Sequence, residues 1–426
     1  MYLKVFPSFI EGNIQVPSSK SYTQRAFIAS LLSNGSTEIL NPGRSEDDNQ
    51  MLSNIEKLGA EISLSNEKIL IKGGLHLKQN QIHAGESGLG IRLITAVTAL
   101  LDTEITITGT GTLQNRPMQV MEKALSQLGA HCQTNNGYLP IKVKGPIKGG
   151  TIETEGSLSS QFLSGLLFAL PLAIKDSTVH INNLKSRPYI DMTLNILDTH
   201  GIKIINTNYQ KFVIQGNQEY KPTKHLMEGD WSNGAFLLVA GAINGNLKVS
   251  GLNPSSLQGD KKVLEALRDS GVDINQTPDY FKVEKAEVLK AFEFNATETP
   301  DLFPPLACLA AYCKGTSHIK GVSRLKHKES NRTEALIKEF TKMGIHIQTS
   351  EHDTLQITGG RPRGGNFFSH NDHRIAMAGA ILGLKSKEPI IIEGYRAVTK
   401  SYPGFFEDLN KLNVKIEKKI QENGNQ

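Results

Sequence analysis

The sequence predicts an α/β protein of two domains, each assembled from three copies of one βαβαββ unit. A short pattern, in which the end of a helix is followed by Gly or Asn and then by a strand, occurs six times along the chain. Between these patterns lie six segments that begin with polar residues and continue as almost wholly apolar helices. A length of 426 residues also exceeds what a single hydrophobic core usually supports.

The recurring pattern marks one helix of each unit and the strand that follows it. It reads IEKLGAEI, LSQLGAHC, LDTHGIKI, LRDSGVDI, FTKMGIHI and LNKLNVKI, with the stop residue at Gly59, Gly129, Gly201, Gly271, Gly344 and Asn413. The spacings are 70, 72, 70, 73 and 69 residues, and an even division of 426 residues into six gives 71. Because Gly and Asn tolerate the left-handed backbone that ends a helix, these matches predict six structural repeats.

The other helix of each unit is expected to be buried. The six segments are SSKSYTQRAFIASLL, GESGLGIRLITAVTALL, SSQFLSGLLFALPLA, DWSNGAFLLVAGAI, DLFPPLACLAAYC and HNDHRIAMAGAILGL. Units of this size cannot bury such helices alone, so we expect three units to pack together in each domain. Free N–H groups at a helix start attract anions. Polar starts on buried helices therefore predict that anions bind where these ends converge.

Cations and small polar residues gather at the predicted helix starts. The buried helices carry Lys20, Ser21, Arg25, Arg92, Ser159, Ser160, Gln161, Asp301, Asp372, His373 and Arg374. The starts of the second helices carry Arg116, Ser186, Arg187, Lys328, Arg332 and Lys400. A single Lys or Arg is more often a solvated charge, and a single Ser or Asp is more often a helix cap. Their repeated placement instead predicts a site for a substrate with two or more phosphate or carboxylate groups.

Charge and composition exclude several classes of protein. The chain has 47 Lys and Arg against 42 Asp and Glu, a net charge of +5, which suits a local anion pocket rather than a nucleic-acid surface. The sequence has no G-x-x-x-x-G-K-[ST], no usable G-x-G-x-x-G, no H-E-x-x-H and no G-x-S-x-G. We therefore expect the anion to be a reactant and expect neither a cofactor nor a metal.

The cysteines and the chain ends suggest a cytoplasmic protein. Cys132, Cys308 and Cys313 fit neither a disulfide framework nor zinc-ligand spacing, so we expect buried reduced thiols. The first residues lack the apolar core of a signal peptide, and no apolar run reaches the ~18 residues of a membrane span. The polar tail, residues 417–426, is expected to fray.

Taken in order, the helix starts resemble the EPSP synthase family of enolpyruvyl transferases. The matching segments, PSSKSYTQRA, RPM, SSQFLSGLL, SRPYIDMTL, EGDWS, PDLFPPLA, HKESNR, NDHRIAMA and TKSYPGFF, run from about residue 10 to 412. The resemblance implies a two-domain inside-out α/β barrel with its active site in the interdomain cleft. Residues 1–18 and 230–426 would form a discontinuous first domain and residues 19–229 the second. We expect a monomer.

The resemblance also implies a reaction and its residues. The family transfers the carboxyvinyl group of phosphoenolpyruvate to the 5-hydroxyl of shikimate 3-phosphate, releasing phosphate through a tetrahedral intermediate, on the route to chorismate and the aromatic amino acids. Shikimate 3-phosphate would be held by Lys20, Ser21, Arg25, Ser159, Ser160, Gln161, Ser186, Tyr189, Asp301, Arg324 and Lys328. Phosphoenolpyruvate would be held by Lys20, Gly88, Arg116, Gln161, Arg332, Arg374 and Lys400. The catalytic residues would be Asp301, which takes the hydroxyl proton, Glu329 or Lys400, which protonates C3, and Lys20.

The sequence departs from the family pattern in two places. GESGLGIR has Glu86 and Leu89 where most relatives have Asn and Thr, in the pocket where glyphosate competes, and Asn331 replaces an Asp. The sister transferase that acts on UDP-N-acetylglucosamine carries a reactive cysteine before its R-P motif, which GTGTLQNRPM lacks. An RNA 3′-phosphate cyclase would need a catalytic histidine after His373, and none follows. A non-catalytic anion-binding protein would gain nothing from Asp301 and Glu329 among its cations.

Overall fold

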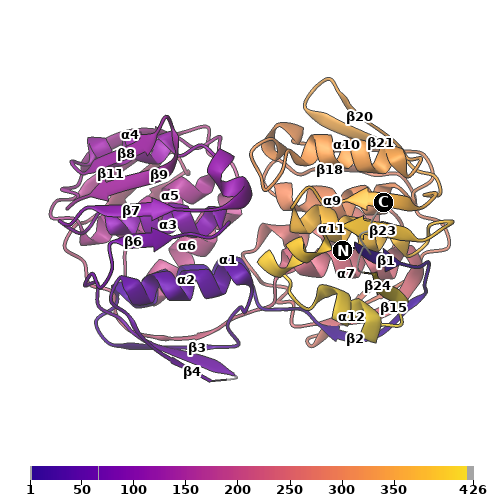
Figure 1. The fold of residues 1–426 in the computed structure, drawn as a ribbon, viewed down its shortest axis with the longest axis horizontal. Helices are drawn as coiled ribbons and strands as arrows, with labels where there is room; N and C mark the ends of the chain where they lie inside the picture. The colour runs from indigo at the N-terminus through magenta and orange to yellow at the C-terminus, as the bar shows by residue number, and fades with distance from the viewer. Residues whose placement is uncertain (1, 66, 420–426) are drawn as a thin grey trace, which may run out of the picture. The chain divides into compact units, whose positions relative to one another are not determined.

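The chain folds into two compact units in the computed structural model, which describes residues 2–65 and 67–419 (Figure 1). The discontinuous unit contains the residues up to Pro17 and those from Gly229 onward, and the continuous unit is Ser18–Glu228. Each bound lies one residue from the boundary that the family resemblance implied. The chain passes between the units twice. Ser19 N donates to Glu228 O at 2.8 Å, and Asp230 N donates to Pro17 O at 2.8 Å, so the outgoing and returning segments are bonded on each side of the crossing.

Each unit holds three sheets of four strands with one shared order. When the four strands are numbered by their order in the repeat, they lie side by side in the sheet as first, second, fourth and third. The first and second strands are parallel, and the other two neighbouring pairs are antiparallel. The sheets of the continuous unit are β14 (Lys224–Leu226), β3 (Ser36–Leu40), β5 (Lys68–Lys72) and β4 (Glu61–Leu64); β6 (Gln81–His83), β7 (Ile105–Thr108), β9 (Tyr138–Lys144) and β8 (His131–Asn135); and β10 (Gly150–Glu155), β11 (Ser177–Asn182), β13 (Lys211–Ile214) and β12 (Ile204–Thr207).

The discontinuous unit repeats this order. Its sheets are β2 (Ile10–Gln15), β15 (Gly245–Ser250), β17 (Tyr280–Glu284) and β16 (Ile274–Gln276); β18 (Glu293–Asn295), β19 (Thr316–Lys320), β21 (Thr354–Thr358) and β20 (His346–Ser350); and β22 (Gly365–Phe368), β23 (Ile390–Glu393), β1 (Tyr2–Val5) and β24 (Ile416–Lys419). The predicted six-fold βαβαββ repeat is therefore confirmed. Strands β1, β2 and β14 are far in sequence from the rest of their sheets, and their pairing closes both units.

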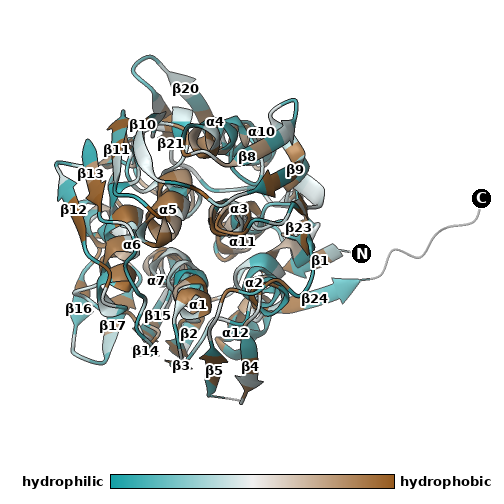
Figure 2. Ribbon diagram, turned by 90° about the vertical axis from the view of Figure 1, so that its left-hand side faces the viewer, coloured by the Kyte–Doolittle hydropathy of each residue, from teal (hydrophilic) through white to brown (hydrophobic). Residues whose placement is uncertain are grey.

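The buried helices form the core of each unit. They are α1 (Lys20–Leu32), α3 (Gly88–Thr98) and α5 (Ser160–Ala169) in the continuous unit, and α7 (Trp231–Asn244), α9 (Phe303–Ala310) and α11 (His373–Gly383) in the discontinuous unit. Almost every residue of these helices is buried, as expected for helices that are apolar on all sides. Figure 2 shows α1, α3 and α5 nearly end-on and largely brown, with the strands of their sheets outside them.

Each repeat also contains a second helix. They are α2 (Glu46–Lys57), α4 (Gln119–Gln127), α6 (Arg187–Thr199), α8 (Val263–Asp269), α10 (Arg332–Lys342) and α12 (Phe405–Lys411). The six predicted stop residues after these helices all have positive φ, from 70° at Asn413 to 130° at Gly59. The expectation for the tail is wrong at residues 417–419, because β24 pairs with β1, with Glu417 opposite Lys4; residues 420–426 lie outside the described residues. Among the described helices, none is long and apolar enough to cross a membrane.

Candidate active site

Five of the six buried helices begin with a side-chain cap. The capping side chain accepts a backbone N–H of the first turn at α1, α3, α5, α7 and α11, and the capping residues are Ser19, Ser87, Ser159, Asp230 and Asp372. Helix α9 differs, because it follows a 3₁₀ turn, Pro300–Leu302, and begins without a side-chain cap. Asp301 lies in that turn, so the capping role that its sequence position allowed is excluded.

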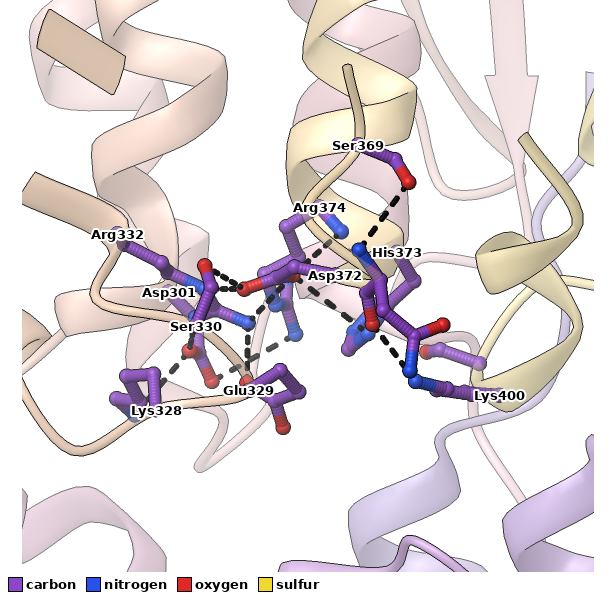
Figure 3. A network of polar contacts seen from close by, with 12 residues as sticks. Asp301, Lys328, Glu329, Ser330, Arg332, Ser369, Asp372, His373, Arg374 and Lys400 are labelled. Atoms are coloured by element: carbon purple, nitrogen blue, oxygen red, sulfur yellow. Dashed lines mark hydrogen bonds and ion pairs between the residues drawn. The ribbon is translucent and has the colours of Figure 1, made fainter. Parts of the chain in front are cut away.

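Asp301 instead contacts three cations of the discontinuous unit. Its Oδ1 accepts from Arg332 Nη1 at 2.6 Å and from Lys328 Nζ at 3.2 Å, and its Oδ2 lies 3.5 Å from Arg374 Nη2 (Figure 3). Burial alone would raise the pKa of the Asp301 carboxyl, but the charges of Arg374, Lys328 and Arg332 outweigh it and hold the pKa well below its usual value. The carboxylate is therefore ionised at neutral pH.

Arg332 is fully buried at the start of α10 and binds three carboxylates. Its Nε and Nη2 donate to the two oxygens of Asp372 at 2.8 and 3.2 Å, and Nη2 also donates to Glu329 at 2.5 Å. With the bond to Asp301, four of its five N–H groups are used within the discontinuous unit, which leaves one on Nη1. These carboxylates keep the pKa of Arg332 above its ordinary value despite burial. Sequence reasoning placed Asp372 at a helix start but did not find its pairing with Arg332.

The other predicted residues of this unit lie around the same cluster. Lys400 Nζ donates to Asn371 O at 2.7 Å, and Lys400 and Arg374 are both nearly buried. Burial lowers the pKa of Lys328 and that of Arg324, and the carboxylate of Asp301 opposes the shift in both cases. The structure thus brings together the predicted Asp301, Arg324, Lys328, Glu329, Arg332, Arg374 and Lys400.

A further buried carboxyl, which the sequence did not point to, faces this cluster. Asp260 lies in the 3₁₀ turn Gly259–Lys262 and accepts a hydrogen bond from Ser232 at the start of α7. Burial, with the charge of Asp301, raises the pKa of Asp260 to about 7, although Arg374 and Ser232 oppose the shift. Its position in LQGDKKV gave no signal in the sequence, because a lone Asp before a helix usually acts as a cap or a solvated charge.

In the continuous unit, Gly88 allows two arginines to approach the start of α3. A Cβ on Gly88 would lie 2.1 Å from Arg116 Nη1 and 3.2 Å from Arg92 Nη1. Arg92 donates to Gln161 Oε1 at 2.5 Å and to Gly88 O at 3.2 Å, and its guanidinium lies 4.6 Å from the centre of the Phe162 ring. Arg92 therefore orients Gln161, a role that its place in the sequence did not reveal.

Arg25 is fully buried among oxygens of the same unit. It donates to Thr193 Oγ1 at 2.8 Å, Ser21 O at 2.9 Å, Tyr189 O at 3.2 Å and Ser164 Oγ at 3.4 Å. Burial lowers its pKa to about 10, so the guanidinium stays charged at neutral pH. These bonds join α1, α5 and α6. Like Arg332, Arg25 has one further N–H group, on Nη1, that these four bonds do not use.

The remaining predicted residues of the continuous unit lie at the starts of α1, α5 and α6. Lys20 Nζ forms an ion pair with Asp47 Oδ2 at 2.9 Å, and Asp47 is in the first turn of α2. Ser186 has a left-handed backbone, with φ of 57°, immediately before α6, and its carbonyl accepts from Tyr189 N at 3.2 Å. Ser21, Ser159, Ser160 and Gln161 complete the set. Glu86 accepts from Thr112 N at 3.2 Å and so supports the loop before Arg116.

The site residues of the discontinuous unit and those of the continuous unit are both suited to binding anions. Within the described residues, no group of three or more His, Cys, Asp or Glu side chains has the arrangement of a metal site. The cationic groups are instead held by hydrogen bonds within each unit, and each set includes arginines that donate planar pairs of N–H groups. The discontinuous unit adds the ionised carboxylate of Asp301, which can accept a proton.

Comparison with known proteins gives one family. Residues 6–409 match the family model of EPSP synthase (3-phosphoshikimate 1-carboxyvinyltransferase). The chain is 38% identical to the 3-phosphoshikimate 1-carboxyvinyltransferase of Clostridium kluyveri, over 98% of each chain, and 36% identical to that of Methanocorpusculum labreanum, over 97% of this chain and 98% of the relative.

Solved structures show the same fold. An EPSP synthase of Acinetobacter baumannii superposes with a TM-score of 0.83 at 25% identity, covering 98% of this chain and 100% of that one. The enolpyruvyl transferase NikO of Streptomyces tendae shares the fold, with a TM-score of 0.80 at 16% identity and 98% coverage of both chains. The two-domain inside-out α/β fold expected from the sequence is thereby confirmed. The chain belongs to the EPSP synthase (3-phosphoshikimate 1-carboxyvinyltransferase) family of transferases.

Proposed function

We propose that this chain transfers the carboxyvinyl group of phosphoenolpyruvate to the 5-hydroxyl of shikimate 3-phosphate and releases phosphate. Family membership over nearly the whole chain supports this activity. The observation that carries the chemistry is the ionised carboxylate of Asp301 within a group of cations. Such an arrangement can bind an anion and accept a proton at the same site. A reaction in which a hydroxyl group attacks an anionic substrate and loses its proton requires both.

The two substrates are assigned to the residues that the sequence suggested. Shikimate 3-phosphate is held by Lys20, Ser21, Arg25, Ser159, Ser160, Gln161, Ser186, Tyr189, Asp301, Arg324 and Lys328. Phosphoenolpyruvate is held by Lys20, Gly88, Arg116, Gln161, Arg332, Arg374 and Lys400. Arg116 and Arg374 supply bidentate donors for its phosphate and carboxylate. Arg25 and Arg332 contribute one N–H each and otherwise align their neighbours, because most of their donors are bonded within the protein.

The reaction proceeds by addition and then elimination. The 5-hydroxyl oxygen bonds to C2 of phosphoenolpyruvate as Asp301 takes the hydroxyl proton, and C3 gains a proton from Glu329 or Lys400. The C2–O bond to phosphate then breaks, and C3 loses a proton to restore the double bond. A carboxylate with a depressed pKa is a weak base. When the substrate carboxylate binds Arg374, that cation is shared and Asp301 becomes more basic.

The test is a phosphate-release assay. Purified protein is mixed with phosphoenolpyruvate and shikimate 3-phosphate, and released phosphate is followed against controls that omit each substrate. Release that requires both substrates is expected. No release, or release only when UDP-N-acetylglucosamine replaces shikimate 3-phosphate, would overturn the proposal. We also propose that the protein acts as a monomer in the cytoplasm; light scattering at assay concentrations should give the mass of one chain.

A further inference from the structure

Glu339 is a buried carboxylate that the proposed reaction does not use. It lies on α10, two helical turns after Arg332, and its side chain is fully buried. The spacing of seven residues places the two side chains on one face of the helix, about 10 Å apart along its axis. Arg332 binds Asp372, as described above. Two partners of Glu339, Phe368 and His370, lie in the segment that leads to Asp372.

Glu339 binds the turn between β22 and α11. Its Oε2 accepts from Phe368 N at 3.0 Å, at the last residue of β22, and its Oε1 is 2.9 Å from His370 Nε2. Lys342 Nζ also donates to both oxygens, at 2.9 and 2.8 Å, from a more exposed position. Burial would raise the pKa of Glu339, but these partners together lower it. The carboxylate is therefore ionised where it meets the turn.

The turn itself has an uncommon backbone. His370 and Asn371 both have positive φ, at 53° and 56°, a conformation that non-glycine residues rarely adopt in succession. Ser369 supports it from one side, because Asn371 N donates to Ser369 Oγ at 3.2 Å and Asp372 N donates to Ser369 O at 2.9 Å. Such a conformation persists only when its surroundings fix it.

Three groups of the candidate site depend on this turn. Asn371 O accepts from Lys400 Nζ at 2.7 Å. Asp372 binds Arg332 through both oxygens and caps α11 by accepting from Arg374 N at 2.9 Å. Helix α10 therefore holds the turn at two points. Glu339 binds the beginning of the turn at Phe368 and His370, and Arg332 binds the end of the turn at Asp372. A shift of the turn would move the groups that set Lys400, Arg332 and Arg374.

We infer that Glu339 is a positioning residue, which fixes the His370–Asn371 turn so that Lys400, Arg332 and Arg374 are aligned for phosphoenolpyruvate. This inference rests on the proposed function, which assigns those three cations to that substrate. Glu339 acts through the backbone of the turn and does not touch the substrate. Its loss should therefore affect the binding of phosphoenolpyruvate more than that of shikimate 3-phosphate.

The experiment compares Glu339→Ala, Glu339→Gln and Lys342→Ala in the full chain. Misplacement of binding groups by about 1 Å can cost up to ~100-fold, so Glu339→Ala should raise KM for phosphoenolpyruvate about 10- to 100-fold, with a much smaller change for shikimate 3-phosphate. Glu339→Gln should recover most of the loss, because its amide oxygen can still accept from Phe368 N or His370 Nε2. Lys342→Ala is the matched control; it removes the exposed partner and leaves the turn bonded, so KM should stay unchanged.

A second variant keeps the inference testable if Glu339→Ala does not fold. His370→Asn preserves a residue that tolerates positive φ but is too short to reach Glu339, and it should raise KM for phosphoenolpyruvate in the same direction. Unchanged KM in folded Glu339→Ala, an equal rise for both substrates, or no recovery in Glu339→Gln would overturn the inference.

Hydrogen exchange separates this inference from the proposed function. Amides of residues 368–372 should exchange faster in Glu339→Ala than in the wild-type protein or Lys342→Ala, whether or not the protein turns over these substrates. Faster exchange in a protein without turnover would support the role of Glu339 in the turn while the proposed function fails. Unchanged exchange would overturn the inference even in an active enzyme.

Discussion

Asp301→Asn should abolish most turnover while leaving the fold intact. The replacement keeps the size of the side chain but removes its charge and its ability to take a proton. In the structure, Asp301 Oδ1 accepts from Arg332 at 2.6 Å and from Lys328 at 3.2 Å, and Oδ2 lies 3.5 Å from Arg374. The asparagine oxygen can still accept from Arg332. Its NH₂ group, however, would face another donor if it took the place of Oδ2 beside Arg374.

Asp301→Asn should affect both turnover and stability, and the effect on turnover should be larger. Loss of a positioned base lowers turnover by about 10²- to 10⁴-fold, which corresponds to about 3–5 kcal/mol in the activation free energy. A hydrogen bond to a charged group contributes about 1.5–3 kcal/mol to stability. Because Arg332 keeps Asp372 and Glu329, we expect the loss in unfolding free energy to lie near the lower end of that range. For a unit of this size, that corresponds to a fall in Tm of about 3–6 °C.

The assay combines kcat at saturating concentrations of both substrates with Tm and calorimetric binding of shikimate 3-phosphate. Glu334→Gln is the matched control, since it makes the same change of charge at an exposed position in the first turn of α10. The control should retain turnover, and Asp301→Asn should bind shikimate 3-phosphate with little turnover. If Asp301→Asn retains near-normal kcat, Asp301 is not the base, and Glu329 becomes the next candidate.

Three further predictions concern Gly88 at the start of α3, the thiols and a histidine pair. Gly88→Ala should weaken phosphoenolpyruvate binding about 10- to 150-fold in a competition assay, because its Cβ would displace Arg116, whose charge-assisted bond contributes about 1.5–3 kcal/mol. Serine replacement of all three cysteines should leave turnover measurable, because burial raises the pKa of each thiol and keeps it protonated. Burial lowers the pKa of His200 and of His225 to about 4, so the unfolded chain binds more protons between pH 6.5 and 4, and stability should fall as pH falls through that window, by a few kcal/mol in denaturant titrations.

Each of these predictions has a control and an opposing outcome. Gly360→Ala should be neutral, since its Cβ would meet only Ile345 Cδ1 at 3.7 Å; equal effects at Gly88 and Gly360 would contradict the steric argument. An inactive but folded cysteine-free variant would show that a thiol takes part in the reaction. His225→Leu should flatten the pH dependence of stability, and an unchanged slope would assign the protons to other groups.

The repeats could be predicted from the sequence because their signals are local. A glycine or asparagine at the end of a helix and an apolar helix with a polar start are each determined within about ten residues, and both were found in the structure. The positions of β1, β2 and β14 could not be derived in this way. Parallel β2 and β15 pair across more than 200 residues, and no local pattern specifies a partner so distant. Only the resemblance to the family implied that crossover.

The candidate site was predictable in its residue types but not in its contacts. The cations at predicted helix starts indicated an anion site, and in the structure Lys20, Arg332 and Arg374 do lie in the first turns of their helices. The sequence could not show that Arg332 pairs with Asp372, 40 residues later, because a buried ion pair leaves no periodic signal. Nor could it show that Asp301 is no helix cap, since Asp before an apolar helix is most often one.

Two buried arginines, Arg25 and Arg332, have side chains whose orientation is fixed by hydrogen bonds within the protein. Arg25 and Arg332 are fully buried, and each uses four of its five N–H groups on oxygens of its own unit. A buried guanidinium without such partners would be strongly unfavourable. The partners therefore hold both arginines in one orientation before any substrate arrives, and little side-chain entropy remains to be lost on binding. Because each has a single remaining N–H, direct recognition of the anions under the proposed function would fall mainly to Arg116, Arg374 and Lys400. The carboxylates, hydroxyls and backbone carbonyls that make the burial of Arg25 and Arg332 possible therefore also fix the positions of both side chains.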